Sequence, residues 1–358
     1  MKQSPSIRRA GHALRETRLL RPDLAGIDGA ARALREGRLV AFPTETVYGL
    51  GADATNPRAV AALYAAKGRP SFNPLIAHLP DLDAALEQGC FNASARALAR
   101  AFWPGALTLV VPLAARGTVC ELARAGLDTV ALRVPAHPLA HELLDKAARP
   151  VAAPSANRSG HVSPTQASHV MDDLDGRVDA VLDGGPTPIG LESTIIACLS
   201  STPILLRAGG VPREAIEGVV GELGDEGERG TVSAPSAERS KRRSIAKHVV
   251  RPLSPGLLAS HYAPRARVRL EARAIKPHEA ALLFGEFRPR GLDHAIAVLN
   301  LSETGSLTEA AANLFGYLRR LDAILAGRKS PTIAVSQIPA RELGEAINDR
   351  LRRAAAGR

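Results

Sequence analysis

Two cations near a predicted helix end are the first residues in this sequence that suggest chemistry. Lys67 and Arg69 lie in the segment KGRPSFNP. The preceding helix is expected to start after Asn56, whose side chain can cap it, with Pro57 at the first helical position and Pro70 as its stop. Cations at a helix C-terminus ordinarily stabilise the helix by only ~0.3–1 kcal/mol. Spacing alone therefore favours a capping role over a phosphate site.

Two further arginines lie inside apolar strand-like sequences. Arg133 belongs to TVALRV and Arg207 to ILLRA, so both side chains are expected to be buried. An unpaired buried guanidinium is costly, and each arginine therefore needs an anionic partner. A substrate carboxylate or phosphate can accept a bidentate pair of hydrogen bonds, and an internal Asp or Glu can do the same. The sequence leaves both kinds of partner open.

Three polar segments lie beside predicted strand ends rather than on the wet face of a helix. They are PTETVYG (43–49), APSAN (153–157) and EST (192–194). Loops at strand ends are where α/β proteins place the groups that contact ligands. These segments and the cations together predict a polar site at one edge of a sheet.

Familiar catalytic motifs are absent from the sequence. There is no GxxxxGK[ST] phosphate loop, no HExxH, no GxSxG and no CxxC. The segment GLGADA (49–54) imitates a dinucleotide fingerprint, but that motif is informative only between a strand and a helix, and no such unit frames it. The chemistry must therefore come from the cations and the polar loops.

Composition places the chain among globular proteins. Its 358 residues are 45% hydrophobic and 23% charged, which is enough for two domains with real cores. Cys90, Cys120 and Cys198 are too few and too widely spaced for a disulfide framework, so a reducing cytoplasm is expected. No apolar run approaches the ~20 residues of a membrane helix, and no membrane association is expected.

The charge is strongly positive. The net charge is +10, and the excess gathers in the first forty residues and in 239–251. Such charge attracts RNA or nucleotides, but a basic run is more commonly a solvated linker. The sequence therefore favours a solvated linker over a binding site for RNA or nucleotides.

The pattern of apolar residues predicts an α/β fold in two parts. We expect an extended mixed sheet in residues 27–221, preceded by a basic extension (1–26), followed by a linker (222–264), and then a small α/β domain (265–358). A second helix is expected after Ser163-Pro164, by the same capping argument as at Asn56. The predicted strands are 39–42, 75–78, 107–112, 129–134, 151–153, 178–182, 193–198, 204–207, 281–284, 295–299 and 332–335, and helices are predicted at 307–326 and 341–356.

Seven segments in order resemble the successive motifs of the YrdC-like threonylcarbamoyl-AMP synthase family. The resemblance extends from about residue 28 to 221, and SPGLLASHYAP (254–264) is similar to the hinge of the long, two-domain members. It implies a twisted mixed sheet around a concave basic cavity, with a small Rossmann-like C-terminal domain. The seven segments are PTETVYGLGADA, KGRPSFNPLIAH, WPGALTLV, AGLDTVALRVPAHP, APSANRSGHVSPT, GLESTII and LLRAGG.

The resemblance also implies roles for individual residues. Lys67 and Arg69 correspond to the catalytic cations at the reacting phosphates, and His78 is expected to position threonine rather than act as a general base. Asn157 is implied at the nucleotide or a metal. The L-threonine positions are Thr46, His78, Arg133, Ala153 and Ser193, and the remaining ATP positions are Asn73, Thr129, Ser155, Ser163, Arg207 and Tyr262.

The implied reaction joins ATP, L-threonine and bicarbonate, with Mg²⁺ accompanying ATP and no Mg²⁺ ligand identified. Its product would pass to a tRNA threonylcarbamoyl transferase, and a weak direct contact with tRNA is left open. Residues 254–264 are expected to form a lid, with Tyr262 either against the nucleotide or as a packing anchor between domains. Two alternative functions remain: an RNA-binding module, disfavoured by 3% aromatic residues, and a carbamoyl-transfer domain of a hydrogenase-maturation enzyme, disfavoured because zinc-finger and acylphosphatase segments are absent.

Overall fold

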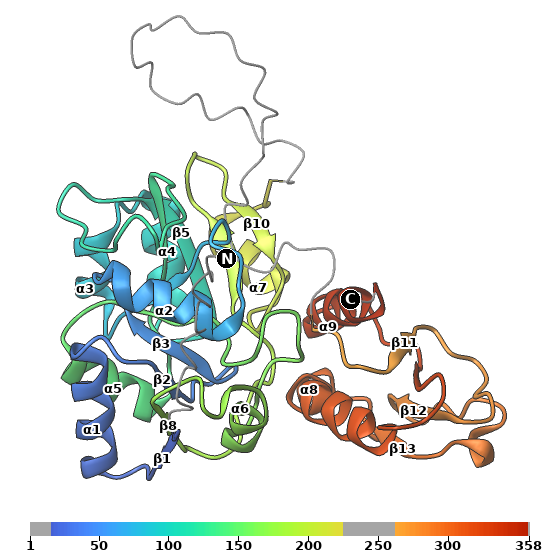
Figure 1. Ribbon diagram of the computed structural model, residues 1–358. Helices are drawn as coiled ribbons and strands as arrows, with labels where there is room; N and C mark the ends of the chain where they lie inside the picture. The colour runs from blue at the N-terminus through green and yellow to red at the C-terminus, as the bar shows by residue number, and fades with distance from the viewer. Residues whose placement is uncertain (1–15, 225–261, 357–358) are drawn as a thin grey trace, which may run out of the picture.

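The computed structural model describes residues 16–224 and 262–356 (Figure 1). They form two α/β units, one built on a ten-stranded sheet and the other on a four-stranded sheet. This confirms the predicted fold class of a twisted mixed sheet followed by a second, smaller α/β unit. The first part of the predicted extension and most of the predicted linker, including 254–261 of the proposed lid, lie outside the described residues. No helix in the described ranges is long and apolar enough to cross a membrane.

The large sheet mixes parallel and antiparallel neighbours, with parallel pairs such as β4 with β6 and antiparallel pairs such as β5 with β6. All eight strands predicted for residues 27–221 are present in this sheet, and those at 107–112 and 204–207 have the predicted limits. In spatial order the strands are β1 (Arg18–Leu20), β8 (Ala180–Leu182), β2 (Val40–Phe42), β3 (Gly49–Asp53), β7 (Val151–Ala152), β4 (Ile76–His78), β6 (Thr129–Arg133), β5 (Leu107–Pro112), β9 (Thr194–Ala197) and β10 (Ile204–Arg207).

Successive side chains along each strand point to opposite faces of this sheet, so the core has one part on each face. Phe42 packs on the face covered by α1 and α5, whereas Ala41 packs on the opposite face, which the other helices cover. Past α1 and α5, the first face carries only a small apolar cluster around Ile76 and Ala131. That part of the face has room for a cavity. The helices of this unit are α1 (Leu24–Arg35), α2 (Pro57–Lys67), α3 (Leu82–Gln88), α4 (Ala93–Phe102), α5 (Pro138–Ala147), α6 (Ala167–Leu174) and α7 (Arg213–Val220).

Of the two helix starts predicted from the sequence, the one at Asn56 is confirmed and the one at Ser163 is not. Asn56 caps α2 by accepting hydrogen bonds from the amides of the first turn, as predicted, but α2 ends at Gly68, whose left-handed φ of 60° stops it before Pro70. The predicted start at Ser163 is wrong, because α6 begins four residues later with no side-chain cap. The Ser163 hydroxyl instead donates to Glu192.

Three short strands escaped the sequence analysis. β3 coincides with the GLGADA segment, whose small residues have low β-propensity. Its glycines are required by packing, since a Cβ on Gly51 would lie 2.9 Å from the Phe42 ring. β1 and β11 (Arg267–Arg269) are three-residue strands containing arginine, too short to show alternation.

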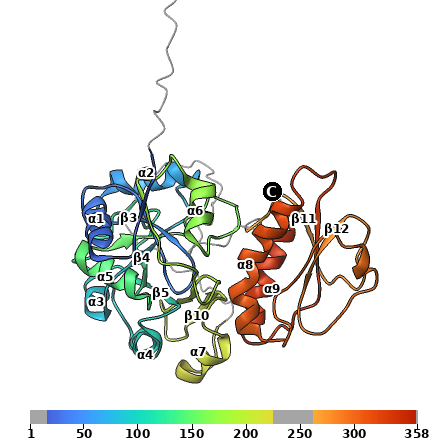
Figure 2. The ribbon, with the colours of Figure 1, turned by 90° about the horizontal axis from the view of Figure 1, so that it is seen from below.

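The second unit is a parallel sheet in the order β11 (Arg267–Arg269), β14 (Thr332–Val335), β12 (Glu279–Leu283) and β13 (Val298–Asn300). Two helices, α8 (Leu307–Ile324) and α9 (Leu343–Ala355), lie between this sheet and the first unit (Figure 2). Their apolar faces share one cluster with Val47, Val162 and Leu191 of the first unit. The two units therefore pack through a continuous core. Strand β13 begins three residues later than predicted.

Candidate functional site

A cavity opens on the part of the large sheet that α1 and α5 leave uncovered. His78 and Arg133 form its floor, because they are register partners at the ends of β4 and β6. Most of the predicted site residues, from segments far apart in the sequence, line this one cavity. Its lining is Thr46, Val47, Arg69, Ile76, His78, Arg133, Ala153, Pro154, Ser155, Glu192, Ser193, Arg207 and Tyr262.

The cavity is rich in positive charge. Arg69 donates from Nη2 to the Pro74 carbonyl at 3.1 Å, and Arg207 donates to the Ser193 carbonyl at 2.8 Å. Neither has a carboxylate within ion-pair distance among residues 16–224 and 262–356. Burial lowers the pKa of Arg69 to about 10, so the group stays charged at neutral pH. Because the guanidinium groups of Arg69 and Arg207 are held by neutral carbonyls, their charge favours an anionic ligand in the cavity.

Arg133 differs, because the protein supplies its anionic partner. Its Nη2 lies 2.6 Å from Glu45 Oε1, and its Nε donates to the Gly105 carbonyl. The second oxygen of Glu45 accepts from the Ala136 amide at 3.0 Å. Of the two partners that the sequence left open, the internal carboxylate is present. Glu45 thus holds Arg133 in place on the cavity floor, and its role was not predicted.

His78 is a buried neutral histidine. It is 2% exposed, its Nδ1 is 3.2 Å from the Ile76 carbonyl, and its ring meets Phe42 edge to face. Burial, with the positive charge of Arg133, lowers the pKa of His78 to about 3. An imidazole with so low a pKa is a poor proton acceptor at neutral pH, which favours positioning over general-base catalysis.

We therefore expect no titration of His78 across the neutral range. The unfolded value is 6.5 and the folded value about 3, so the unfolded state binds the additional proton between them. The stability that depends on neutral His78 is complete above the unfolded pKa and decreases as pH falls toward about 3. An NMR titration of the His78 ring should show no inflection between about pH 5 and about pH 9. A transition close to 6.5 would refute this description of the cavity floor.

Lys67 lies behind the cavity rather than on its lining. It is 3% exposed, and its Nζ donates to the carbonyls of Ser155 and, at 2.5 Å, Asn157. Burial lowers its pKa well below the usual value. Lys67 thus fixes the 155–157 loop that forms one wall, and its contact with reacting phosphates stays a prediction.

Four other predicted residues also lie off the lining. Asn73 Oδ1 and Asn157 Oδ1 are buried with no hydrogen-bond partner in the described part of the chain, so each retains capacity to accept from a ligand. Ser163 is occupied by Glu192. Thr129 lies on the same sheet face as Arg133. The two residues are four positions apart along β6, so about 13 Å separates them.

Arg350 of the second unit supports the cavity wall from behind, since it contacts the lining residues Glu192 and Tyr262, and the sequence did not identify it. Arg350 is fully buried, and its Nε lies 2.8 Å from Glu192 Oε2. Its guanidinium also lies 5.1 Å from the centre of the Tyr262 ring. Burial tends to raise the pKa of Glu192, but Arg350 and Arg207 outweigh this and lower it. Glu192 is therefore an ionised carboxylate, fixed at the cavity by a residue of the other domain.

Tyr262 both lines the cavity and anchors the second unit. It is 1% exposed and stacks on Phe315 of α8, with ring centres 5.6 Å apart. The anchoring alternative is therefore present in the structure, whereas contact with a nucleotide stays a prediction. Burial raises the pKa of its hydroxyl, which keeps the group neutral.

Resident metal ligands are not evident. The described ranges contain no group of three or more His, Cys, Asp or Glu side chains suited to a metal ion. Glu192, the carboxylate on the lining, is already bonded to Ser163 and Arg350.

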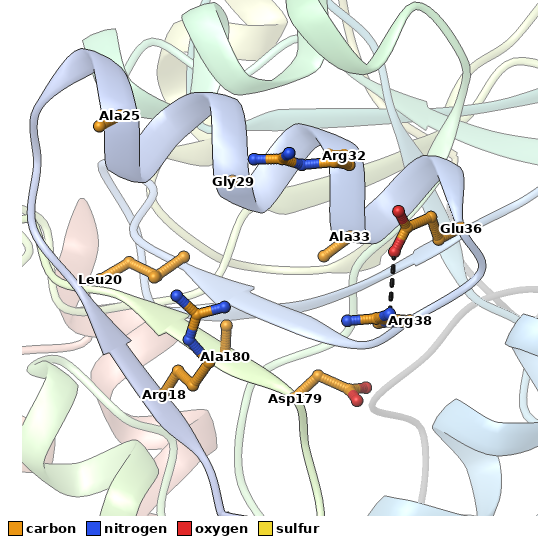
Figure 3. Close-up of a pocket in the computed structure, with 10 residues that line it drawn as sticks. All are labelled: Arg18, Leu20, Ala25, Gly29, Arg32, Ala33, Glu36, Arg38, Asp179 and Ala180. Atoms are coloured by element: carbon orange, nitrogen blue, oxygen red, sulfur yellow. Dashed lines mark ion pairs between the residues drawn. The ribbon is translucent and has the colours of Figure 1, made fainter.

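A second hollow lies between α1, β1 and β8 (Figure 3). Charges of both signs surround it, including the ion pair of Arg38 with Glu36 at 3.1 Å. Asp179 is used by the backbone, since it accepts from the Leu39 amide. None of the predicted site residues reaches this hollow, so it is not the candidate site.

The fold and cavity together define an α/β protein with a basic cavity that lies on a twisted mixed sheet and is completed by a second α/β domain. The chain belongs to the threonylcarbamoyl-AMP synthase family, in its long two-domain form. Residues 32–209 match the Sua5/YciO/YrdC family model, described as "Telomere recombination", and residues 211–356 match the model "Threonylcarbamoyl-AMP synthase, C-terminal domain". The resemblance noted in the sequence is thereby confirmed.

Full-length relatives support this assignment. The chain is 40% identical to the threonylcarbamoyl-AMP synthase of Bacillus subtilis, over 92% of each chain. It is also 40% identical to that of Pyrococcus abyssi, over 91% of this chain and 92% of the relative. The crystal structure of P. abyssi Sua5 complexed with L-threonine is similar at a TM-score of 0.78 and 36% identity, covering 95% of this chain and 97% of that one.

Proposed function

We propose that this chain is an L-threonylcarbamoyladenylate synthase, a nucleotidyltransferase. It converts ATP, L-threonine and bicarbonate into threonylcarbamoyl-AMP, pyrophosphate and water. The observation that carries the proposal is the convergence of Arg69, Arg133 and Arg207 on one cavity beside a neutral His78. The threonine bound to the P. abyssi relative supports the choice of amino acid.

The proposed reaction needs electrostatic stabilisation rather than a protein nucleophile. The threonine amine and bicarbonate form an N-carboxylate, with loss of water. A carboxylate oxygen then attacks the α-phosphorus of ATP, and the bond to pyrophosphate breaks. Negative charge gathers where the guanidinium groups of Arg69 and Arg207 are held by neutral partners rather than by a carboxylate, and cations placed in advance at such a point lower the barrier. Mg²⁺, entering with ATP, would add to this stabilisation when bound.

The arrangement of the floor suggests how the substrates lie. In our proposal Arg133 and His78 hold threonine at the end of β6, and the nucleotide extends along the strand toward Thr129. The ~13 Å between these positions suits an extended nucleotide. The 155–157 loop, anchored by Lys67, would border the phosphates. Ser163, Asn73 and Asn157 then lie behind this first layer.

The direct test is threonine-dependent release of pyrophosphate from ATP and bicarbonate, with threonylcarbamoyl-AMP identified as the second product. Activity that needs all three substrates supports the proposal. RNA binding without such turnover would favour the alternative of an RNA-binding module. In a cytoplasmic setting, we propose that the product passes to a tRNA threonylcarbamoyl transferase.

Arg133→Ala should raise the KM for threonine far more than the KM for ATP, because the variant loses a guanidinium at the proposed carboxylate position. Arg149→Ala is the matched control, since Arg149 also pairs with a buried carboxylate, Asp53 at 2.6 Å, but lies outside the cavity lining. The measurement is steady-state pyrophosphate release with each substrate varied in turn. Equal rises in both KM values would assign Arg133 a structural role through Glu45 only.

A further inference from the structure

A second candidate site lies at the carboxyl edge of the C-terminal sheet. The loops that follow β11, β12 and β14 meet there around a cavity, on a sheet that lies beyond α8 and α9 as seen from the first unit (Figure 2). It shares no lining residue with the cavity of the proposed reaction. The lining is Glu271, Ala272, Arg273, Phe284, Glu286, Phe287, Arg288, Arg290, Gln337 and Pro339.

The topology places this cavity where α/β sheets commonly bind ligands. From β12 the chain passes to β13 on one side, and it then returns through α8 to β14 on the other side of β12. The chain therefore reverses its direction across the sheet at β13, which is an edge strand. In parallel α/β sheets, ligands bind outside the carboxyl ends of the strands, and the loops that line this cavity follow those ends.

The side chains around the cavity suit a phosphate beside an aromatic base. Arg273, Arg288 and Arg290 are exposed, and none forms an ion pair with an Asp or Glu of residues 16–224 or 262–356. Phe287 is 50% exposed, although its ring is large and apolar. Guanidinium groups bind phosphate bidentately, and an exposed ring can stack on a base.

Hydrogen bonds restrain the backbone segments that carry these side chains. The Ile275 amide donates to the Arg290 carbonyl at 2.8 Å, and the Arg290 amide donates to the Arg273 carbonyl at 3.2 Å. These bonds keep the segments of Arg273 and Arg290 side by side. Asn300 donates to the Gly285 carbonyl at 2.9 Å and so restrains the turn that leads to Phe287.

The two acidic residues on the lining restrict which phosphate compounds can bind in this cavity. Glu271 and Glu286 would repel a bare polyphosphate, but their carboxylates can accept hydrogen bonds from ribose hydroxyls or base amino groups. A nucleoside phosphate matches both signs of charge and the exposed ring. We propose that this cavity binds a nucleoside phosphate, with Arg273 and Arg290 at the phosphate and Phe287 at the base.

The test counts nucleotide sites on the full-length protein. Calorimetric titration with a non-hydrolysable ATP analogue should give two sites in the native protein and one in Arg273→Gln/Arg290→Gln. Threonine-dependent pyrophosphate release should be unchanged in that variant. Arg320→Gln/Arg328→Gln, which removes two exposed arginines of the same domain outside the lining, should retain two sites.

A second arm separates the sources of a nucleoside phosphate. Binding of a short single-stranded RNA, followed by fluorescence anisotropy, would assign the site to RNA if Arg273→Gln/Arg290→Gln abolished it while the native protein showed one ATP site. One ATP site together with RNA binding that the variant does not weaken would overturn the proposal. Inorganic pyrophosphate bound at this cavity as tightly as the nucleotide would overturn recognition of the base, as would equal losses in the control variant.

Discussion

Arg69→Ala should lower the rate of threonine-dependent pyrophosphate release by about 10²–10³-fold, the effect of removing one preorganised charge donor from a reacting centre. Arg69 lines the cavity and is held by backbone carbonyls. Its Nη2 lies 3.1 Å from the Pro74 carbonyl oxygen. Its charge is therefore not consumed by an internal carboxylate, and its loss removes stabilisation at the phosphates. The measurement is kcat and KM for ATP at saturating threonine.

The control for Arg69→Ala is stability. Arg69 bonds to the Asn73 and Pro74 carbonyls of its own loop and interacts with the Tyr64 hydroxyl nearby, so thermal unfolding should stay close to that of the native protein. Lys67→Ala should differ, because it also removes the ties from α2 to the Ser155 and Asn157 carbonyls and should lower both activity and Tm. Near-normal turnover of folded Arg69→Ala would contradict the proposed role of this arginine.

Local patterns predicted the large sheet and a polar site at its strand ends, and the resemblance to the family supplied the individual cavity residues. Strands such as β5 and β10 are continuous apolar runs, and their limits follow from burial on both faces. Thr46, His78 and Ser193 met at one cavity as expected because each lies in or beside a strand end, where the sheet brings separate segments together. The position of each residue at a strand end is encoded within its own short segment of the sequence.

The ion pairs that hold the cavity together were not predicted, because they join segments that are distant in the sequence. The Arg133 partner, Glu45, is 88 residues away, and the Glu192 partner, Arg350, is 158 residues away. Neither pair leaves a local signal, since Arg350 lies on an amphipathic helix with several other arginines. β3 was missed because glycine and alanine suit its crowded contact with Phe42, although they are poor strand formers.

Arg350→Met should be the most destabilising of the variants considered. It leaves Glu192 ionised and buried without its cation, a change that costs about 3–5 kcal/mol when one partner of a buried pair is removed. It should also displace Tyr262 and Glu192 from the cavity wall and raise the KM for ATP. Arg213→Met is the matched control, because its partner Glu345 also joins the two domains, but both side chains are 33% exposed. Such a pair is worth only about 0–1 kcal/mol.

The double variant Glu192→Gln/Arg350→Met separates the unpaired charge from lost packing. With no carboxylate left to bury, it should recover most of the free energy of unfolding measured by denaturant titration. The deficit of Arg350→Met should also grow as pH rises from about 4 to about 7, because burial without Arg350 raises the pKa of Glu192 above its unfolded value and ionisation then opposes folding. A deficit independent of pH, with no recovery in the double variant, would show that Arg350 contributes packing alone and that the C-terminal domain does not set the charge of the cavity.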